Sequence, residues 1–228
     1  MGTSVFNPAV CPLCLQDVCG PGESLCPSCC ARLVPLPSPR CPCCGGVLDG
    51  VVAMCGECLS LPERAWGHAV CIYPYRGPIR EVIHQLKYRN QPYCARFLGG
   101  QLATTWREHA PDMPDAVIPI PLHWLKQLRR GYNQAELLAS AMARALGVPL
   151  RFVLLRSQRT RQQARLSLEE RRQNVQNCFK LRGRAKLQGA HIVVVDDVFT
   201  TGATLDAAVR TLLSGGAGRV SVATVARG

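Results

Sequence analysis

The stretch that decides the fold is Ile192–Leu205, which reads IVVVDDVFTTGATL. Its first four residues are apolar and β-branched, which is typical of a strand buried on both faces of a parallel sheet. Two acids follow, Asp196 and Asp197, and then a Thr-Thr-Gly turn that opens a segment with apolar residues at helical spacing. A strand, a turn and a helix in this order indicate an α/β fold.

The alternation of strands and helices continues on both sides of this stretch. Asn133 can cap one of the expected helices, and Gly147 can end it. Such alternation favours right-handed crossovers and a mostly parallel sheet. We expect strands at Ala69–Tyr75, Ala116–Pro121, Phe152–Leu155, Ile192–Val195 and Arg219–Val225, and helices at Pro78–Lys87, Tyr93–Arg107, Gln134–Leu146 and Thr204–Leu213.

The acid pair and the turn after it suit a ribose 5-phosphate. In an open α/β sheet, ligands bind beyond the carboxyl ends of the strands, where the acids lie if the strand ends at Val195. The N–H groups at a helix N-terminus bind phosphate, and the carboxylates can accept hydrogen bonds from ribose hydroxyls. The alternative is a purely structural Asp-rich turn, but no other phosphate loop of the GxxxxGK[ST] or GxGxxG type occurs in the chain. The predicted ligand-binding residues are Asp196, Asp197, Thr200, Thr201, Gly202, Ala203 and Thr204.

The N-terminal part holds four CxxC pairs: CPLC, CPSC, CPCC and CGEC. Each CxxC turn brings two thiolates to one Zn²⁺, and two pairs complete a tetrahedral site. Eight ligands therefore predict two structural zinc sites, a double zinc ribbon whose folding is coupled to metal binding. The predicted ligands are Cys11, Cys14, Cys26, Cys29, Cys41, Cys44, Cys55 and Cys58.

The spacing of the pairs leaves their pairing open. The gaps between successive pairs are 11, 11 and 10 residues, so spacing does not separate a sequential from a nested arrangement. We favour the sequential arrangement, in which the first two pairs form one site and the last two the other. Cys30 and Cys43 lie beside ligands and could substitute for them, whereas Cys19 is expected to be a bystander.

Charge divides the chain in the same place as the cysteines. The formal charge is +12, yet residues 1–66 hold three basic and five acidic residues, a net of −2, which leaves +14 for the rest. We therefore predict two domains, a double zinc ribbon at 1–62 and an α/β domain at 63–228. The segment Arg156–Lys186 carries ten basic residues and two acids, which favours a phosphate-bearing partner, although a solvated basic face is the alternative.

Composition and hydropathy restrict the class of protein. Apolar residues make up 47% of the chain and charged residues 18%, which is typical of a folded domain with a core. No apolar run approaches the ~20 residues that span a bilayer, and the N-terminus MGTSVFNPAVC lacks the pattern of a signal peptide. We expect no membrane insertion and a cytoplasmic location, where cysteines are reduced or metal-bound.

The stretch IVVVDDVFTTGATL resembles the phosphoribosyl pyrophosphate (PRPP) signature of type I phosphoribosyltransferases. Three further segments, LKYRNQ (Leu86–Gln91), PIPLHWLKQLRRGYNQAELLA (Pro119–Ala139) and RTRQQARLSLEERRQNVQNCF (Arg159–Phe179), resemble successive blocks of the ComF family, competence and DNA-utilisation proteins related to these transferases. With the CxxC pairs, the resemblance covers essentially the whole chain. It implies a Rossmann-like type I phosphoribosyltransferase core with a mostly parallel sheet, a small N-terminal zinc-ribbon domain, and PRPP chelated by Mg²⁺ as the ligand.

The resemblance also implies roles for individual residues. Asp196 and Asp197 would take the ribose hydroxyls, and Thr200–Thr204 would take the 5-phosphate. The pyrophosphate would lie towards the loop after AVIPIP, and the RGYNQ block there is explained equally well as a helix cap with a packing tyrosine. The candidate cations for the pyrophosphate are Lys87, Arg89, Arg129 and Arg130.

Three functions stay open. The family suggests a protein that binds PRPP and handles internalised single-stranded DNA in natural transformation or DNA utilisation, with DNA-uptake or recombination proteins as partners. The alternatives are an active phosphoribosyltransferase acting on an unidentified base or amine, with the basic segment closing over PRPP, and a PRPP-sensing regulator. Trp124, Tyr132 and Phe179 offer faces for base stacking. The candidate arginines for the DNA backbone are Arg159, Arg161, Arg165, Arg171 and Arg172.

Overall fold

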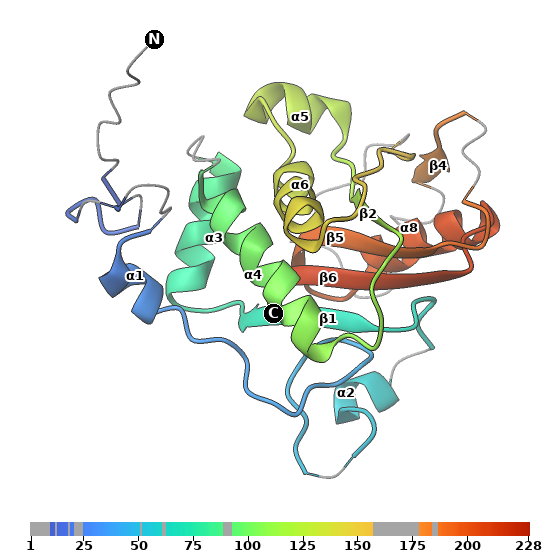
Figure 1. Ribbon diagram of the computed structural model, residues 1–228, viewed down its shortest axis with the longest axis horizontal. Coiled ribbons are helices and arrows are strands. Elements are labelled where there is room, and N and C mark those ends of the chain that lie inside the picture. Colours follow the sequence, from blue (N-terminus) through green and yellow to red (C-terminus); the bar gives the residue numbers. More distant parts are fainter. Residues whose placement is uncertain are drawn as a thin grey trace.

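The core of the protein is a four-stranded parallel sheet with the strand order β1-β6-β5-β2 (Figure 1). The computed structural model describes residues 10–11, 13–17, 19–20, 25–50, 52–60, 63–88, 93–156, 178–183 and 187–228. The strands are β1 (Ala69–Pro74), β6 (Arg219–Arg227), β5 (His191–Phe199) and β2 (Ala116–Pro119). This arrangement confirms the α/β fold and the mostly parallel sheet.

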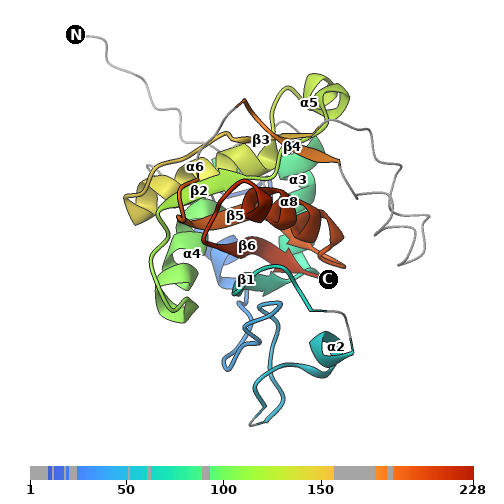
Figure 2. The ribbon, with the colours of Figure 1, turned by 90° about the vertical axis from the view of Figure 1, so that its right-hand side faces the viewer.

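Helices cover both faces of the sheet, because its central strand is apolar on both sides (Figure 2). Val193 and Val195 point into a core shared with α3 (Pro78–Tyr88), α4 (Tyr93–His109) and α6 (Gln134–Leu146). Ile192 and Val194 alternate with them and point into a second core, shared with α8 (Ala203–Ser214). The period of two along a strand produces this division.

Helix α6 forms at the predicted residues because both of its ends are capped. The Asn133 side chain accepts a hydrogen bond from the Ala135 N–H at 3.1 Å and donates one to the Ile120 carbonyl at 2.9 Å. Gly147 ends the helix in the left-handed conformation, with φ of 74°. The other predicted helices are confirmed with ends that differ by at most two residues.

The predicted strands differ from the observed ones in extent, and one of them also pairs outside the parallel sheet: β2 ends two residues earlier and β6 two residues later than predicted. Strand β5 does not end at Val195 but continues to Phe199, because β6 runs beside it and supplies hydrogen-bonding partners as far as Arg227. The other neighbour, β2, ends opposite Val195. The segment predicted as a strand at 152–155 forms β3 (Leu154–Arg156), which pairs antiparallel with β4 (Phe179–Leu181) outside the parallel sheet.

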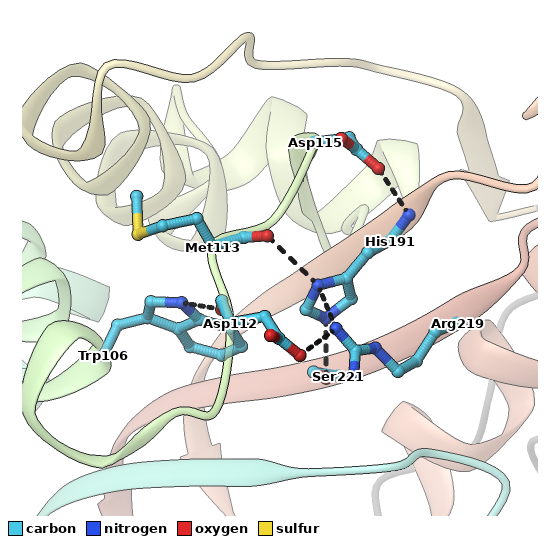
Figure 3. Close-up of polar contacts among 7 residues, drawn as sticks. All are labelled: Trp106, Asp112, Met113, Asp115, His191, Arg219 and Ser221. Atoms are coloured by element: carbon cyan, nitrogen blue, oxygen red, sulfur yellow. Dashed lines mark hydrogen bonds and ion pairs between the residues drawn. The ribbon is translucent and has the colours of Figure 1, made fainter.

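A polar network ties the strands together at the edge opposite the carboxyl ends (Figure 3). His191, the first residue of β5, lies with Nε2 3.0 Å from the Ser221 hydroxyl and Nδ1 2.9 Å from the Arg219 guanidinium. Arg219 also forms an ion pair with Asp112 at 2.7 Å. Nδ1 also lies 3.3 Å from the Met113 carbonyl. The guanidinium can only donate and the carbonyl can only accept, so the tautomer of His191 decides which of these two hydrogen bonds Nδ1 forms.

The cysteine-rich segment packs directly on the α/β core. It contributes the short helices α1 (Pro27–Ala31) and α2 (Gly56–Leu59). The Leu36 N–H donates to the Ile72 carbonyl of β1, and the Ala69 N–H donates to the Pro42 carbonyl, both at 2.7 Å. The division of the chain at residue 62 stays a prediction. Among the described residues, no helix has both the length and the apolar character that a bilayer crossing requires.

Candidate functional site

The acid pair lies on the part of β5 that β2 no longer flanks. Asp197 is buried, and its carboxylate forms an ion pair with the Lys87 ammonium at 2.9 Å. Lys87 comes from the last turn of α3, so the pair joins two elements that are 110 positions apart in sequence. Asp196 is half-buried and accepts a hydrogen bond from the Asp197 N–H at 2.8 Å. The site therefore combines two carboxylates with one cation that neutralises one of them.

The two acids have different surroundings: Asp197 is paired with Lys87, whereas Asp196 is not. Burial, and secondly the carboxylate of Asp197, raise the pKa of Asp196 to about 7. The pKa of Lys87 is also raised: burial alone lowers it, but the charge and hydrogen bond of Asp197, together with the charges of Asp196 and Tyr75, outweigh burial. The arrangement therefore presents Asp197 paired with Lys87, together with a carboxyl at Asp196 that, when protonated, can both donate and accept a hydrogen bond.

The predicted phosphate turn follows β5 directly and opens α8. Gly202 occupies the N-cap position with φ of 76°, a left-handed conformation that favours glycine. The Thr201 hydroxyl accepts a hydrogen bond from the Ala203 N–H at 3.4 Å, which orders the first turn of the helix. Thr200 is exposed, whereas Gly202 and Ala203 are buried. The five predicted residues thus form one continuous strand-to-helix turn next to the acids.

Some of the other predicted site residues lie near α5 and α6, and the rest lie outside the described part of the chain. Arg130 lies with its guanidinium carbon 4.8 Å from the centre of the Tyr88 ring, at the end of α5 (Trp124–Arg130). Tyr132 donates to the Leu86 carbonyl at 2.5 Å and Asn133 caps α6, so these two residues of the RGYNQ block act as packing tyrosine and helix cap. The predicted residues outside the described part of the chain are Arg89, Arg159, Arg161, Arg165, Arg171 and Arg172, as is the side chain of Arg129.

The eight predicted zinc ligands gather in two clusters of four. Cys11, Cys14, Cys26 and Cys29 form the first cluster, and Cys41, Cys44, Cys55 and Cys58 form the second, with all sulfurs of a cluster within 4.8 Å of one another. This grouping matches the sequential arrangement of pairs. The described cysteines form no disulfides.

The geometry of both clusters fits a tetrahedral metal. Zinc with Zn–S bonds of ~2.3 Å requires sulfur–sulfur separations of about 3.8 Å. The Cys14 and Cys26 sulfurs are 3.9 Å apart, and those of Cys44 and Cys55 are 3.7 Å apart. The Gly46 N–H also donates to the Cys44 sulfur at 3.4 Å, a contact that stabilises a thiolate. The two clusters could therefore hold structural zinc.

Three residues near the site were missed by the sequence analysis. Arg156, at the end of β3, lies close enough to Asp196 to oppose the rise of that pKa. Arg64 and Trp66 contact the phosphate turn from the segment that follows the second cluster. A basic or aromatic residue in a connecting segment carries no motif, so only the tertiary structure identifies these three.

Comparison with known proteins finds one family model and several relatives that are similar to this chain. The model of the phosphoribosyl transferase domain matches residues 132–228. Competence protein F of Haemophilus influenzae is 36% identical over 195 residues, which cover 83% of this chain and 85% of that protein. The DNA utilization protein YhgH of Salmonella typhi is 33% identical over 220 residues, covering 94% of this chain and 95% of that protein. Competence protein ComFC of Bacillus subtilis is 29% identical over 213 residues, covering 91% and 85%.

Proposed function

We propose a function for this chain on the premise that it belongs to the ComF family of competence and DNA-utilisation proteins, with a type I phosphoribosyltransferase fold. The proposed function is to bind PRPP, chelated by Mg²⁺, and to take part in handling internalised single-stranded DNA. The observation that carries the PRPP part is the continuity of the acid pair with the Thr-Gly turn at the carboxyl end of β5.

Each part of this site has a role that its chemistry supports. The carboxyls of Asp196 and Asp197 accept hydrogen bonds from the ribose 2′ and 3′ hydroxyls, while Lys87 fixes the position of Asp197. The backbone N–H groups of the turn and the partial positive charge of the α8 N-terminus attract the 5-phosphate. Arg130, and the predicted Lys87, Arg89 and Arg129, are the candidate cations for the pyrophosphate. Mg²⁺, when bound, neutralises part of the pyrophosphate charge.

A calorimetric titration with Mg–PRPP tests the site. We expect binding by the wild type and a loss of at least tenfold in affinity in the double variant Asp196→Asn/Asp197→Asn, because asparagine reduces the charge-assisted hydrogen bonds to the sugar. Asp49→Asn is the control, since Asp49 is exposed and outside the site. Equal affinity of the double variant and the wild type would refute the site.

The DNA part of the proposal is supported by exposed aromatic side chains beside a cation. Tyr88 is 55% exposed and Trp124 is 63% exposed, and Arg130 stacks on Tyr88. Bases stack on such rings with little sequence preference, and a protein with a charge of +12 attracts the phosphate backbone. The predicted DNA-binding arginines between 159 and 172 would add to this charge.

Fluorescence anisotropy with a labelled thymidine oligonucleotide tests the DNA part. We expect affinity to fall steeply as salt rises, because bound counterions are released. Trp124→Ala should weaken binding about tenfold, as the loss of one stacked base does. Phe152→Ala is the control, since Phe152 is 47% exposed on a different segment. Binding that does not change with salt would refute the DNA part.

The match to the phosphoribosyl transferase domain model favours a second function, transfer of the phosphoribosyl group. In such a step, a nitrogen of a base or amine forms a bond to the ribose C1, and the bond from C1 to pyrophosphate breaks. Release of pyrophosphate from Mg–PRPP in the presence of candidate acceptors measures this reaction. Release that stops in the Asp196→Asn/Asp197→Asn variant would establish transfer, whereas PRPP binding without release favours a PRPP sensor.

A further inference from the structure

The segment that joins the second cysteine cluster to β1 contacts the first turn of α8. The Ala65 N–H donates to the Asp206 carboxylate at 3.1 Å, and Asp206 lies in that turn. The Trp66 indole N–H donates to the carbonyl of Cys43 at 2.8 Å, and Cys43 lies between two cysteines of the second cluster. Trp66 is only 5% exposed, so this hydrogen bond is shielded from water. One short segment thus connects the cluster to the helix that begins at the phosphate turn.

The side chains of this segment also enclose Gly202, the residue at the centre of the phosphate turn. A Cβ atom on Gly202 would lie 2.9 Å from the Arg64 guanidinium, 3.0 Å from the Trp66 ring and 3.1 Å from the Phe199 ring. Trp66 meets Phe199 edge to face, with ring centres 5.9 Å apart. The Arg64 guanidinium carbon lies 5.3 Å from the centre of the Trp66 ring and 5.8 Å from that of Phe199. On the side where a Cβ atom of Gly202 would lie, these three side chains therefore leave no space between themselves and the turn.

The two cysteine clusters differ in their relation to the turn. The second cluster shares one hydrophobic core with Trp66, Phe199 and Ala203. The first cluster belongs to the core on the other face of the sheet, with residues of α3 and α4. A change in the second cluster can therefore reach the turn through Cys43 and Trp66, whereas a change in the first cluster acts on the opposite layer.

We propose that Arg64 and Trp66 are positioning residues, which hold the Thr200–Thr204 turn in its phosphate-binding conformation and make that conformation depend on the second cysteine cluster. This inference rests on the proposed function, because it assumes that the turn binds the phosphate of PRPP. The hydrogen bond from the indole N–H holds Trp66 against Cys43, so Trp66 moves if Cys43 moves. Trp66, together with Arg64 and Phe199, packs against Gly202, so such a movement changes the packing of the turn. An intact second cluster then keeps the turn ordered before the ligand arrives, which lowers the entropic cost of binding.

Two matched variants of the 228-residue chain test the role of Trp66. Trp66→Phe keeps an aromatic ring but removes the N–H that bonds to Cys43, so we expect Mg–PRPP affinity to fall about three- to tenfold. Trp106→Phe is the control, because the Trp106 N–H also donates to a backbone carbonyl, that of Asp112, at the opposite edge of the sheet (Figure 3). It should leave the affinity unchanged. Arg64→Lys should bind more tightly than Arg64→Met, because lysine keeps the cation.

Amide hydrogen exchange provides a readout that does not require the ligand. We expect exchange of residues 202–206 to be faster in Trp66→Phe and in Cys55→Ser, which changes the second cluster, than in Cys14→Ser, which changes the first. If the wild type does not bind Mg–PRPP, the proposed function fails. The exchange rates of residues 202–206 then decide on their own whether Trp66 and the second cluster keep the turn ordered. If the wild type binds but Trp66→Phe and Cys55→Ser change neither affinity nor exchange, the inference is overturned while the proposed function stands.

Discussion

At the scale of single residues, the site depends on how its charges are arranged. Asp197 is buried and would be strongly unfavourable there as an isolated anion, yet Lys87 compensates it at 2.9 Å. None of the ion pairs formed by the described residues involves Asp196, and burial, with the neighbouring Asp197 carboxylate, raises its pKa to about 7. The two neighbouring acids therefore act differently: Asp197 is held by a lysine, whereas Asp196 changes its charge near neutral pH.

This difference predicts a pH-dependent stability effect of Asp196→Asn. The folded pKa of Asp196 lies above its unfolded value, so ionisation destabilises the folded state increasingly from about pH 4 to pH 7. The variant should be more stable than the wild type by about 2–4 kcal/mol at pH 8, and this gain should shrink as pH falls towards 4. Urea denaturation at several pH values measures it. Asp49→Asn, at an exposed position, should show no such trend, and a gain that is the same at every pH would contradict the prediction.

At the other edge of the sheet, His191 should make the folded state less stable as pH falls, which is the opposite of the effect of Asp196. Burial, and secondly Arg219, lower its pKa, so the unfolded state takes up the proton first as pH falls through about 6.5. The Met113 carbonyl at the ring, and then the charges of Asp112 and Asp115, partly offset this effect. His191→Gln should therefore lose less stability between pH 7.5 and pH 5 than the wild type does. Ser221→Ala removes the same hydrogen bond without a titrating group, so it should cost about 1 kcal/mol at both pH values in thermal denaturation.

At the scale of elements, the sequence pattern predicted the features that neighbouring residues determine, such as the ends of a helix. Helix α6 has the predicted ends because Asn133 and Gly147 cap it. Strand β5 was predicted too short, because acids are poor strand formers and its extension depends on β6, whose paired residues lie 28 positions later. The antiparallel pairing of β3 with β4 and the contact of Lys87 with Asp197 are also long-range, so no local pattern contains them. The sequence thus predicted the acid pair and the turn but not the side chains that surround them.

The packing around Gly202, at the start of α8, predicts how much stability is lost when this glycine is replaced by alanine. Gly202→Ala places a side chain in a left-handed conformation, which costs ~1–2 kcal/mol, and pushes it against Arg64, Trp66 and Phe199. Gly147→Ala is a matched control, because Gly147 has φ of +74° but no atom within 4 Å of the added methyl. Both variants should be destabilised in urea, and Gly202→Ala by at least 1 kcal/mol more. An equal loss in the two variants would show that Arg64 and Trp66 do not crowd the turn.

At the scale of the whole molecule, the cysteine clusters take part in both layers of the core. The first cluster packs with α3 and α4, and the second packs with α8 and the turn. Because the cysteine-rich segment contains few large apolar side chains, we expect metal binding to supply much of the free energy that folds it. Structural zinc contributes ~10–16 kcal/mol in small peptides. Chelation of zinc should therefore loosen both layers of the α/β core as well as unfold the segment that holds the cysteines.

Zinc content measured by elemental analysis distinguishes the two pairing arrangements. We expect two zinc ions per wild-type chain, one for each cluster. Under sequential pairing, Cys14→Ser/Cys26→Ser changes two ligands of the same site and should lose one zinc, whereas Cys14→Ser/Cys55→Ser should lose both. Nested pairing reverses these results, because Cys14 would then share a site with Cys55 and not with Cys26. Since the sulfurs of Cys14 and Cys26 lie 3.9 Å apart, we expect the sequential outcome.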